Sequence, residues 1–161
     1  MQPITEPDAV LTTEIDASPA EVWTVVSDVT RIPEWSPVCH RCEWVDGSDG
    51  PVVGARFRGF NRLNGARWSR ECIITAAEPA QELAFSTLFK GQESTRWRYR
   101  VDAAGATTTV SEAYQIVMMP RWVRVLRRLP GATAKSERDT RWNIERSLER
   151  LKAVVEGAAK T

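Results

Sequence analysis

The chain has 161 residues, with 22 lysines and arginines against 21 aspartates and glutamates, and a formal net charge of +1. This length fits a single domain over residues 1–161 with a sizeable core, and the balanced charge excludes the strong basic excess typical of nucleic-acid binding, so we expect no nucleic-acid partner. No apolar run reaches the roughly 18 residues of a membrane span, and the first residues lack a signal-peptide pattern. The three cysteines cannot all form disulfides with one another. We therefore expect a cytoplasmic protein with reduced thiols.

The first predicted elements are a strand over residues 9–16 and a helix that begins after Ser18. Ser18 and Glu21 have the spacing of a capping box, and Pro19 stands where its missing N–H costs nothing. The apolar residues of this helix recur at helical spacing and predict one buried face. That face consists of Val22, Val25, Val26 and Val29.

A proline corner follows this helix. Pro33 disfavours helical geometry at Ile32, so we expect the helix to end by about residue 30 and a separate short turn to present Trp35. Trp35 stands between Pro33 and Pro37. Two interpretations of this tryptophan remain open: it plugs one end of a core, or it rims a pocket.

The middle of the chain is typical of a meander of antiparallel strands. Asn64-Gly65 stands between two strand-like runs, which is the strongest short-range hairpin signal. Lys90-Gly91 and Ala104-Gly105 separate later runs in the same way. We expect strands over residues 38–45, 53–63, 66–78, 82–89, 94–103 and 106–118.

The end of the chain changes to helical periodicity from Ser136 onwards, and Gly157 is the expected stop. Its apolar residues lie three or four positions apart and form one stripe. The stripe consists of Ile144, Leu148, Leu151 and Val155. An antiparallel sheet with one polar face needs a cover on its other face, and this long amphipathic helix is the obvious cover.

This order of elements resembles the helix-grip fold of the START-like (SRPBCC) superfamily, and the local sequence resembles its bacterial polyketide cyclase/dehydrase branch. The matching pieces are ASPAEVWTVVSDVTRIPEWSP, VGARFRGFNR, IITAAEP followed by LAF, WRYRV, and GATTTVSE. The resemblance implies an α+β fold in which a curved antiparallel sheet wraps around the long C-terminal helix. Two short helices would close one end, with Trp35 near an end of a cavity between helix and sheet.

Strand alternation predicts which side chains face that cavity. In TRWRYRV, three arginines alternate with Trp97 and Tyr99, and arginines belong in water, so we expect Trp97 and Tyr99 to point inward. In GARFRGFNRL the arginines again occupy one face, which leaves Phe57 and Asn61 on the inner one.

Two other strands have less clear alternation. In RWSRECII we favour Trp68, Arg70 and Cys72 as the side chains that point inward. The guanidinium group of Arg70 would then require a polar partner or water in or at the mouth of the cavity. The sequence does not decide which face of residues 106–118 points inward.

Together these residues predict a small-molecule pocket whose wall is mostly apolar, with few polar groups. The alternative is that the large side chains fill the space themselves and that Asn61 bonds to backbone. The expected ligand-binding residues are Trp35, Phe57, Asn61, Trp68, Arg70, Phe85, Trp97 and Tyr99.

The motif CHRC, residues 39–42, has the spacing of two thiol ligands. Zinc prefers four ligands and no second such pair exists, and side chains three positions apart on a strand point to opposite faces. A redox pair of this spacing usually lies at the start of a helix. We therefore expect no metal, no cofactor and no site at Cys39 and Cys42.

No residue stands out as catalytic. His40 is the only histidine, and the chain contains no nucleophile elbow, phosphate loop or dinucleotide fingerprint. Acid–base work would fall to Tyr99, Glu112 or Arg70.

Residues 119–135 match the family least well and are a candidate lid or insertion. The stretch PRWVRVLRRLPG within them predicts a short basic amphipathic helix. Three interpretations of this helix remain open. It packs as an ordinary surface helix, it forms a lid over the pocket mouth, or its residues 121–129 make transient contact with an anionic membrane surface.

The resulting hypothesis is a domain that binds a hydrophobic small molecule, such as a lipid, an isoprenoid or a polyketide-like compound. The alternative is a polyketide cyclase, aromatase or dehydratase acting in the same cavity. A third option is a protein-interaction module. A buried, paired Tyr–Glu or Arg–Glu beside the ligand would favour the enzyme. A cavity closed to solvent would favour the carrier. A shallow, open groove would favour the interaction module.

Overall fold

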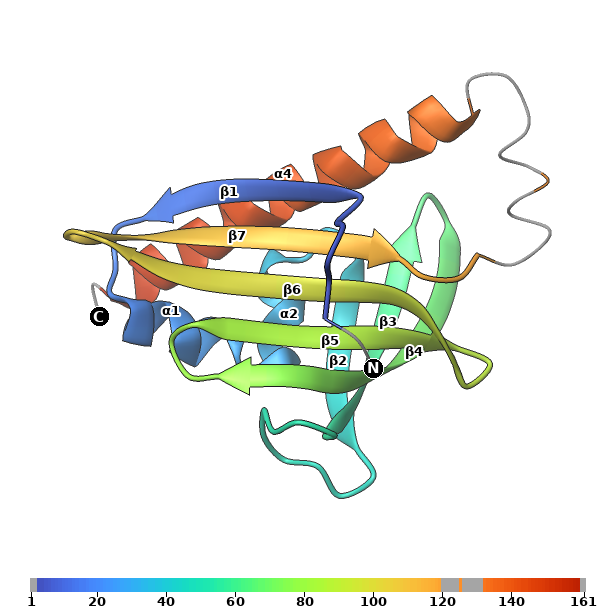
Figure 1. Ribbon diagram of the computed structural model, residues 1–161, viewed down its shortest axis with the longest axis horizontal. Coiled ribbons are helices and arrows are strands. Elements are labelled where there is room, and N and C mark those ends of the chain that lie inside the picture. The colour runs from blue at the N-terminus through green and yellow to red at the C-terminus, as the bar shows by residue number, and fades with distance from the viewer. Residues whose placement is uncertain (1–2, 120–124, 126–131, 160–161) are drawn as a thin grey trace.

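A curved antiparallel sheet and one long helix dominate the computed structural model, which describes residues 3–119, 125 and 132–159 (Figure 1). The order of the strands across the sheet is β1-β7-β6-β5-β4-β3-β2. The strands are β1 (Ala9–Ile15), β2 (Cys39–Val45), β3 (Arg56–Leu63), β4 (Ala66–Glu78), β5 (Glu82–Phe89), β6 (Gln92–Ala104) and β7 (Thr107–Ile116). The α+β helix-grip fold predicted from the sequence is confirmed.

The short helices follow β1 as the sequence predicts, but the first one ends earlier. Helix α1 (Pro19–Val26) stops at Val26, a 3-10 turn covers Val29–Arg31, and α2 (Ile32–Trp35) is a single separate turn. The early end has a local cause, because Asp28 Oδ1 accepts a hydrogen bond of 3.0 Å from the Thr30 N–H and so starts a new turn.

The predicted capping box begins α1. Ser18 Oγ accepts from the Glu21 N–H at 3.3 Å, and the Ser18 N–H donates to Glu21 Oε2 at 2.7 Å. Two backbone N–H donors at the helix start, those of Ser18 and Glu21, are thereby satisfied.

We expect Ser18→Ala to lower the free energy of unfolding by about 1 kcal/mol, because the alanine leaves a first-turn N–H without its acceptor. Urea unfolding at neutral pH measures this loss. Ser18→Asp keeps an acceptor and should retain most of the stability. Equal losses in the two variants would mean that the cap contributes little.

The hairpins have the turn chemistry that the sequence indicates. Asn64 and Gly65 both have positive φ, 49° and 82°, as a tight turn between right-twisted strands requires. This turn places Leu63 opposite Ala66 and fixes the register of β3 against β4. Lys90 and Gly91, with φ of 52° and 76°, join β5 to β6 in the same way.

Helix α4 (Ala132–Ala158) covers the inner face of the sheet (Figure 1). The predicted apolar stripe is confirmed, since each of its members is buried: Ile144, Leu148, Leu151 and Val155. The helix packs mainly against β1 and α2. Space therefore remains between α4 and the middle of the sheet, where the cavity described below lies.

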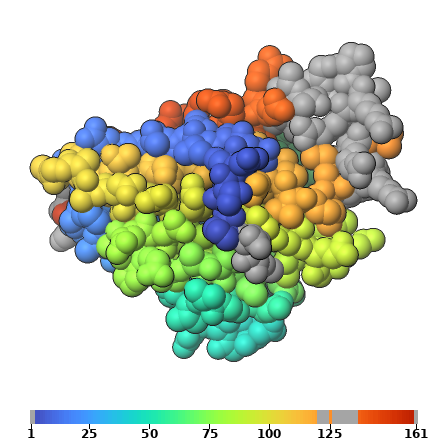
Figure 2. Space-filling model, in the orientation of Figure 1, coloured from blue at the N-terminus to red at the C-terminus, as the bar shows by residue number. Residues whose placement is uncertain are grey.

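The N-terminal segment crosses the outer face of the sheet, opposite α4 (Figures 1 and 2). Arg96 Nη1 and Arg98 Nη1 donate to the carbonyls of Pro3 and Ile4, at 3.5 and 3.3 Å. The two arginines lie on the predicted outer face, but they are half-buried beneath this segment and not fully in water.

The candidate lid over residues 119–135, including the predicted membrane contact at 121–129, falls largely on residues 120–124 and 126–131, which lie outside the described residues. Within the ranges that the structure describes, no helix is both long and apolar enough to cross a membrane.

Candidate ligand cavity

A cavity of about 460 Å³ lies between the sheet and α4. Its wall comes from strands β2 to β7, from the corner around α2, and from one face of α4. Apolar and aromatic side chains make up most of the wall. The volume falls within the roughly 300–1,000 Å³ of small-molecule sites.

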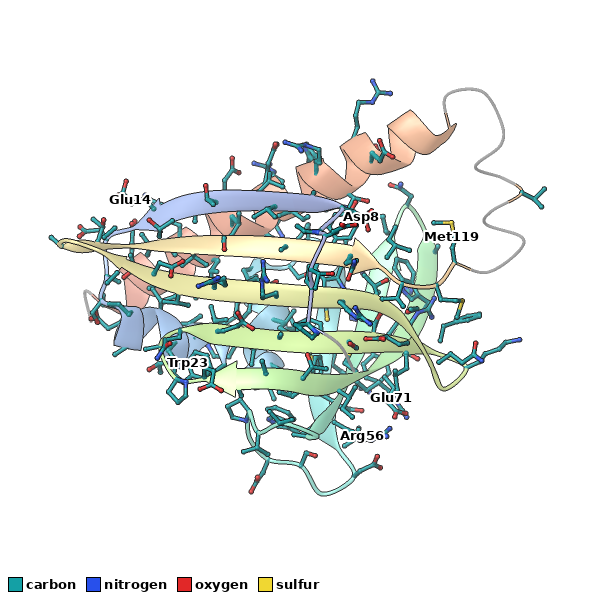
Figure 3. The ribbon with its side chains drawn as sticks, in the orientation of Figure 1. Asp8, Glu14, Trp23, Arg56, Glu71 and Met119 are labelled. Atoms are coloured by element: carbon teal, nitrogen blue, oxygen red, sulfur yellow. The ribbon has the colours of Figure 1, made fainter. Side chains whose placement is uncertain are left out.

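The mostly apolar wall of the cavity contains a deeply buried polar pair. Near the β3–β4 and β5–β6 hairpins the wall contains the apolar side chains Leu63, Phe89 and Met119 beside the polar side chains Asn61 and Arg70; Met119 follows the end of β7 (Figure 3). Farther along the strands the wall contains Tyr99 and Glu112, which are 5% and 3% exposed. A ligand in this space would meet an apolar region and a buried polar pair.

Seven of the eight residues expected to bind ligand lie in the cavity wall: Phe57, Asn61, Trp68, Arg70, Phe85, Trp97 and Tyr99. The inward faces predicted for β3, β4 and β6 are therefore confirmed. Arg56 lies on the outer face, where it contacts Glu71 (Figure 3). Ligand binding by the seven residues stays a prediction.

Trp35 is the exception, because the structure places it in the core and not in the cavity wall. Its side chain is fully buried, and the corner meets the cavity through Ile32, Ser36 and Pro37 instead. Neighbouring residues of a helical turn differ in direction by about 100°, so Ser36 reaches the cavity while Trp35 points into the core. Of the two interpretations of Trp35, the one in which its side chain fills one end of the core agrees with its position.

The large aromatic side chains pack against one another and leave the cavity open. Phe57 lies edge-on to Trp44 and to Phe85, with ring centroids 6.0 and 5.1 Å apart. Trp97 stacks on Tyr114 at 5.5 Å. These pairs fix the side chains of the wall in place, and the alternative that they fill the whole space is wrong.

The polar centre of the cavity is a hydrogen-bonded pair of buried side chains. Tyr99 Oη donates to Glu112 Oε1 at 2.9 Å across neighbouring strands. The hydroxyl of Ser147 on α4 also faces the pair. Among the described residues, neither Glu112 Oε2 nor Trp35 Nε1 makes a hydrogen bond of good geometry, although the Trp35 side chain lies beside the Tyr99 hydroxyl. Buried polar atoms without partners are rare in proteins, and a ligand group is one way to satisfy them.

Burial raises the pKa of Glu112 to about 7, although hydrogen bonds from Tyr99 and Ser147 partly oppose this shift. Burial, followed by the charge of Glu112, raises the pKa of Tyr99 well above its ordinary value. The tyrosine therefore remains protonated, whereas the carboxyl group can gain or lose a proton near neutral pH.

Two members of this polar centre were not placed by sequence reasoning. Glu112 is a candidate for acid–base work, but the inward face of its strand stayed undecided; in the structure Glu112 and Ile116 line the cavity. Ser147 was missed. Its signal is its spacing, since it lies three residues after Ile144 and four before Leu151, a hydroxyl within the apolar stripe of α4.

Arg70 finds its partners locally. Its guanidinium donates to the Ser69 carbonyl at 3.0 Å and lies over the Phe89 ring, 5.2 Å from the centroid. This aromatic contact supports a half-buried charge in the cavity wall.

The positions of Cys39 and Cys42 in the CHRC motif differ from the prediction that their side chains point to opposite faces of the strand. The register between β2 and β3 shifts between Cys39 and Arg41, so the strand contains an irregularity of the β-bulge type. One extra residue reverses the alternation, and both Cys39 and Cys42 line the cavity. The expectation that they point to opposite faces is wrong. Over residues 3–119, 125 and 132–159, no group of three His, Cys, Asp or Glu side chains is arranged to hold a metal ion.

Comparison with known proteins supports the fold and gives a family. The sequence model of one family, described as "Polyketide cyclase / dehydrase and lipid transport", matches residues 7–156. No curated protein matches the sequence. Among solved structures, the chain is similar to the Polyketide_cyc-like protein Cgl2372 from Corynebacterium glutamicum, with 28% identity, a TM-score of 0.56 and 91% of each chain covered.

Two further structures show the fold alone. Protein NE0264 from Nitrosomonas europaea has a TM-score of 0.71 at 12% identity, over 98% of this chain and 99% of that one. The di-domain ARO/CYC protein BexL from the BE-7585A biosynthetic pathway has a TM-score of 0.67 at 21% identity. That similarity covers 92% of this chain and 46% of BexL, so the chain spans about half of the di-domain protein.

Proposed function

Because this chain belongs to the polyketide cyclase / dehydrase and lipid transport family, we propose that it binds a hydrophobic small molecule of lipid, isoprenoid or polyketide type in the cavity beneath α4. The observation that carries this proposal is the cavity itself, with about 460 Å³ of space and a largely aromatic and aliphatic wall. Apolar area removed from water supplies the affinity of such a site.

The buried pair of Tyr99 and Glu112 supports a preference for ligands with one polar group. Glu112 Oε2 has no partner among the described residues, so a hydroxyl or carbonyl oxygen of the ligand fits there, depending on whether the carboxyl group is ionised or protonated. Such a group would be oriented toward the polar centre while the rest of the molecule contacts the apolar wall.

An environment-sensitive apolar dye such as anilinonaphthalene sulfonate should bind with about micromolar affinity, on the order of 8 kcal/mol. Tryptophan emission should change at the same time, because Trp68 and Trp97 line the cavity. Fluorescence titration measures both quantities.

A matched pair of variants locates the binding. Trp68→Ala removes a ring from the cavity wall and should weaken dye binding, whereas Trp142→Ala removes a tryptophan that is 54% exposed on α4 and should leave the affinity unchanged. Unchanged emission with a broad panel of apolar dyes and lipids would argue strongly against a ligand site.

A second candidate function is catalysis of a cyclisation or dehydration in the same cavity, and the Tyr99–Glu112 pair favours it. A carboxyl group with a pKa of about 7 is suited to proton transfer near neutral pH. Native mass spectrometry of the protein purified from its own host would identify the bound compound. A compound that wild type converts and Glu112→Gln leaves unchanged would indicate an enzyme; a compound that wild type returns unchanged would indicate a carrier.

A further inference from the structure

The cavity wall contains a pair of thiols that ligand binding by itself does not require. Cys39 and Cys42 both line the cavity, because the irregularity between Cys39 and Arg41 reverses the alternation of β2. All three cysteines of the chain are free thiols. Cys42 and Cys72 are 7% and 4% exposed, whereas Cys39 is only half-buried, so Cys39 is the most accessible of the three.

The Cys39 sulfur lies beside a glycine of the neighbouring strand. Gly59 lies opposite Cys42 in β3. A Cβ atom at Gly59 would lie 3.6 Å from Cys39 Sγ and would meet no other heavy atom within 4 Å. The sulfur therefore lies over bare backbone, and both Cys39 and Gly59 belong to the cavity wall.

The surroundings of the pair favour Cys39 as the reactive thiol. The Cys39 S–H donates to the Arg41 carbonyl at 3.2 Å. A hydrogen bond with the Cys42 thiol lowers the pKa of Cys39, and the same contact together with burial raises the pKa of Cys42. A thiolate is the nucleophilic form of cysteine, so the more accessible position of Cys39 in the cavity wall, together with its contact with the buried Cys42 thiol, favours Cys39 as the nucleophile.

We propose that Cys39 is a covalent capture site for apolar α,β-unsaturated aldehydes and ketones that enter the cavity. The sulfur forms a bond to the β-carbon, and the electron pair of the carbon–carbon double bond moves to the α-carbon. The α-carbon then takes up one proton, which balances the proton lost by Cys39. No atom leaves, and neither partner is oxidised or reduced. The proposal rests on the proposed function, since the cavity must admit an apolar chain.

The test uses trans-2-nonenal, the short enal crotonaldehyde and the saturated aldehyde nonanal as probes. Intact-mass spectrometry of the wild-type protein should show one nonenal adduct, and peptide mapping should place it on Cys39. Cys72 is the internal control in the same molecule and should stay unmodified. Cys39→Ser should lose the adduct.

Chain length and the second thiol give two quantitative readouts. Nonenal should react at least about ten-fold faster than crotonaldehyde, because each additional buried methylene favours the cavity. Cys42→Ala removes the thiol that stabilises the Cys39 thiolate, so the adduct should still form on Cys39 but more slowly at neutral pH, with the rate rising at higher pH.

Several outcomes would overturn the proposal. These are an adduct on the neighbouring His40 or on lysines, an adduct that persists in Cys39→Ser, equal rates for the long and short enals, or a disulfide between Cys39 and Cys42 in place of an adduct. Dye displacement separates this failure from failure of the proposed function. If nonanal displaces the dye but nonenal forms no adduct, the cavity binds apolar aldehydes and Cys39 does not capture them.

Discussion

Glu112→Gln should be more stable than the wild-type protein at about pH 8, by about 3 kcal/mol, and equally stable near pH 4.5. The folded protein raises the pKa of Glu112 from 4.5 to about 7 because the carboxyl group is buried. As pH rises between these values, the unfolded chain loses this proton and the folded protein keeps it. Wild type therefore loses stability through this window, with no further loss from Glu112 above about pH 7.

The stability of the glutamine variant does not fall in this way, because its side-chain amide does not titrate. The amide carbonyl can still accept a hydrogen bond from the Tyr99 hydroxyl. Urea unfolding of both proteins at a series of pH values measures the difference, and the contributions of the other carboxyl groups cancel in it. Glu78→Gln, at an exposed position at the end of β4, is the control and should follow wild type. A stability difference that is constant with pH would contradict a buried, titrating Glu112.

Trp35→Ala should lower the free energy of unfolding by about 3–5 kcal/mol, because it leaves a large cavity in the core. Trp35 is fully buried and lies outside the cavity wall. Its removal should change dye affinity little under conditions where the variant is folded. Trp35→Phe retains most of the apolar volume and removes the indole N–H that has no partner among the described residues, so it should be much less destabilised.

Trp97→Ala should have the opposite profile. Trp97 is half-buried in the cavity wall and stacks on Tyr114, so its loss should weaken dye binding by about ten-fold or more and destabilise the fold less than Trp35→Ala. Urea unfolding and dye titration of the two variants give the comparison. If Trp35→Ala abolishes dye binding and keeps wild-type stability, Trp35 belongs to the ligand site after all.

Features set by short stretches of sequence were predictable. The capping box of Ser18 and Glu21, the Asn64-Gly65 hairpin and the apolar stripe of α4 all depend on spacings within a few residues, and the structure confirms each of them. The inward faces of β3 and β6 were predictable for a related reason. Their arginines mark one face clearly, so the alternation of the strand assigns the other face.

The face of β7 could not be read from its sequence because both of its faces are partly buried. Glu112 lies toward the cavity and is 3% exposed, while Ala113 on the other face is 1% exposed. The N-terminal segment crosses that outer face, and the Gln115 side chain donates to the Glu6 carbonyl at 3.0 Å. A strand covered on both sides loses the polar–apolar alternation on which the prediction depends.

The position of Cys39 could not be predicted for a different reason. A β-bulge is a property of two paired strands, and the register shift that turns Cys39 toward the cavity arises in the pairing of β2 with β3. The direction of Trp35 is likewise decided by tertiary packing at the corner. In both cases the determining residues lie far apart in the sequence, so no local pattern contains the information.

The irregularity in β2 also affects how this protein behaves at high concentration. Strand β2 forms one edge of the sheet, and an edge strand with regular unpaired N–H and C=O groups can pair with an edge of a second molecule. In β2 the regular spacing is interrupted between Cys39 and Arg41, and Arg41 and Glu43 form an exposed ion pair of 3.3 Å along the strand. An interrupted, charged edge is a poor template for intermolecular strand addition, so the same local defect that turns a thiol toward the cavity also protects the sheet against edge-to-edge aggregation.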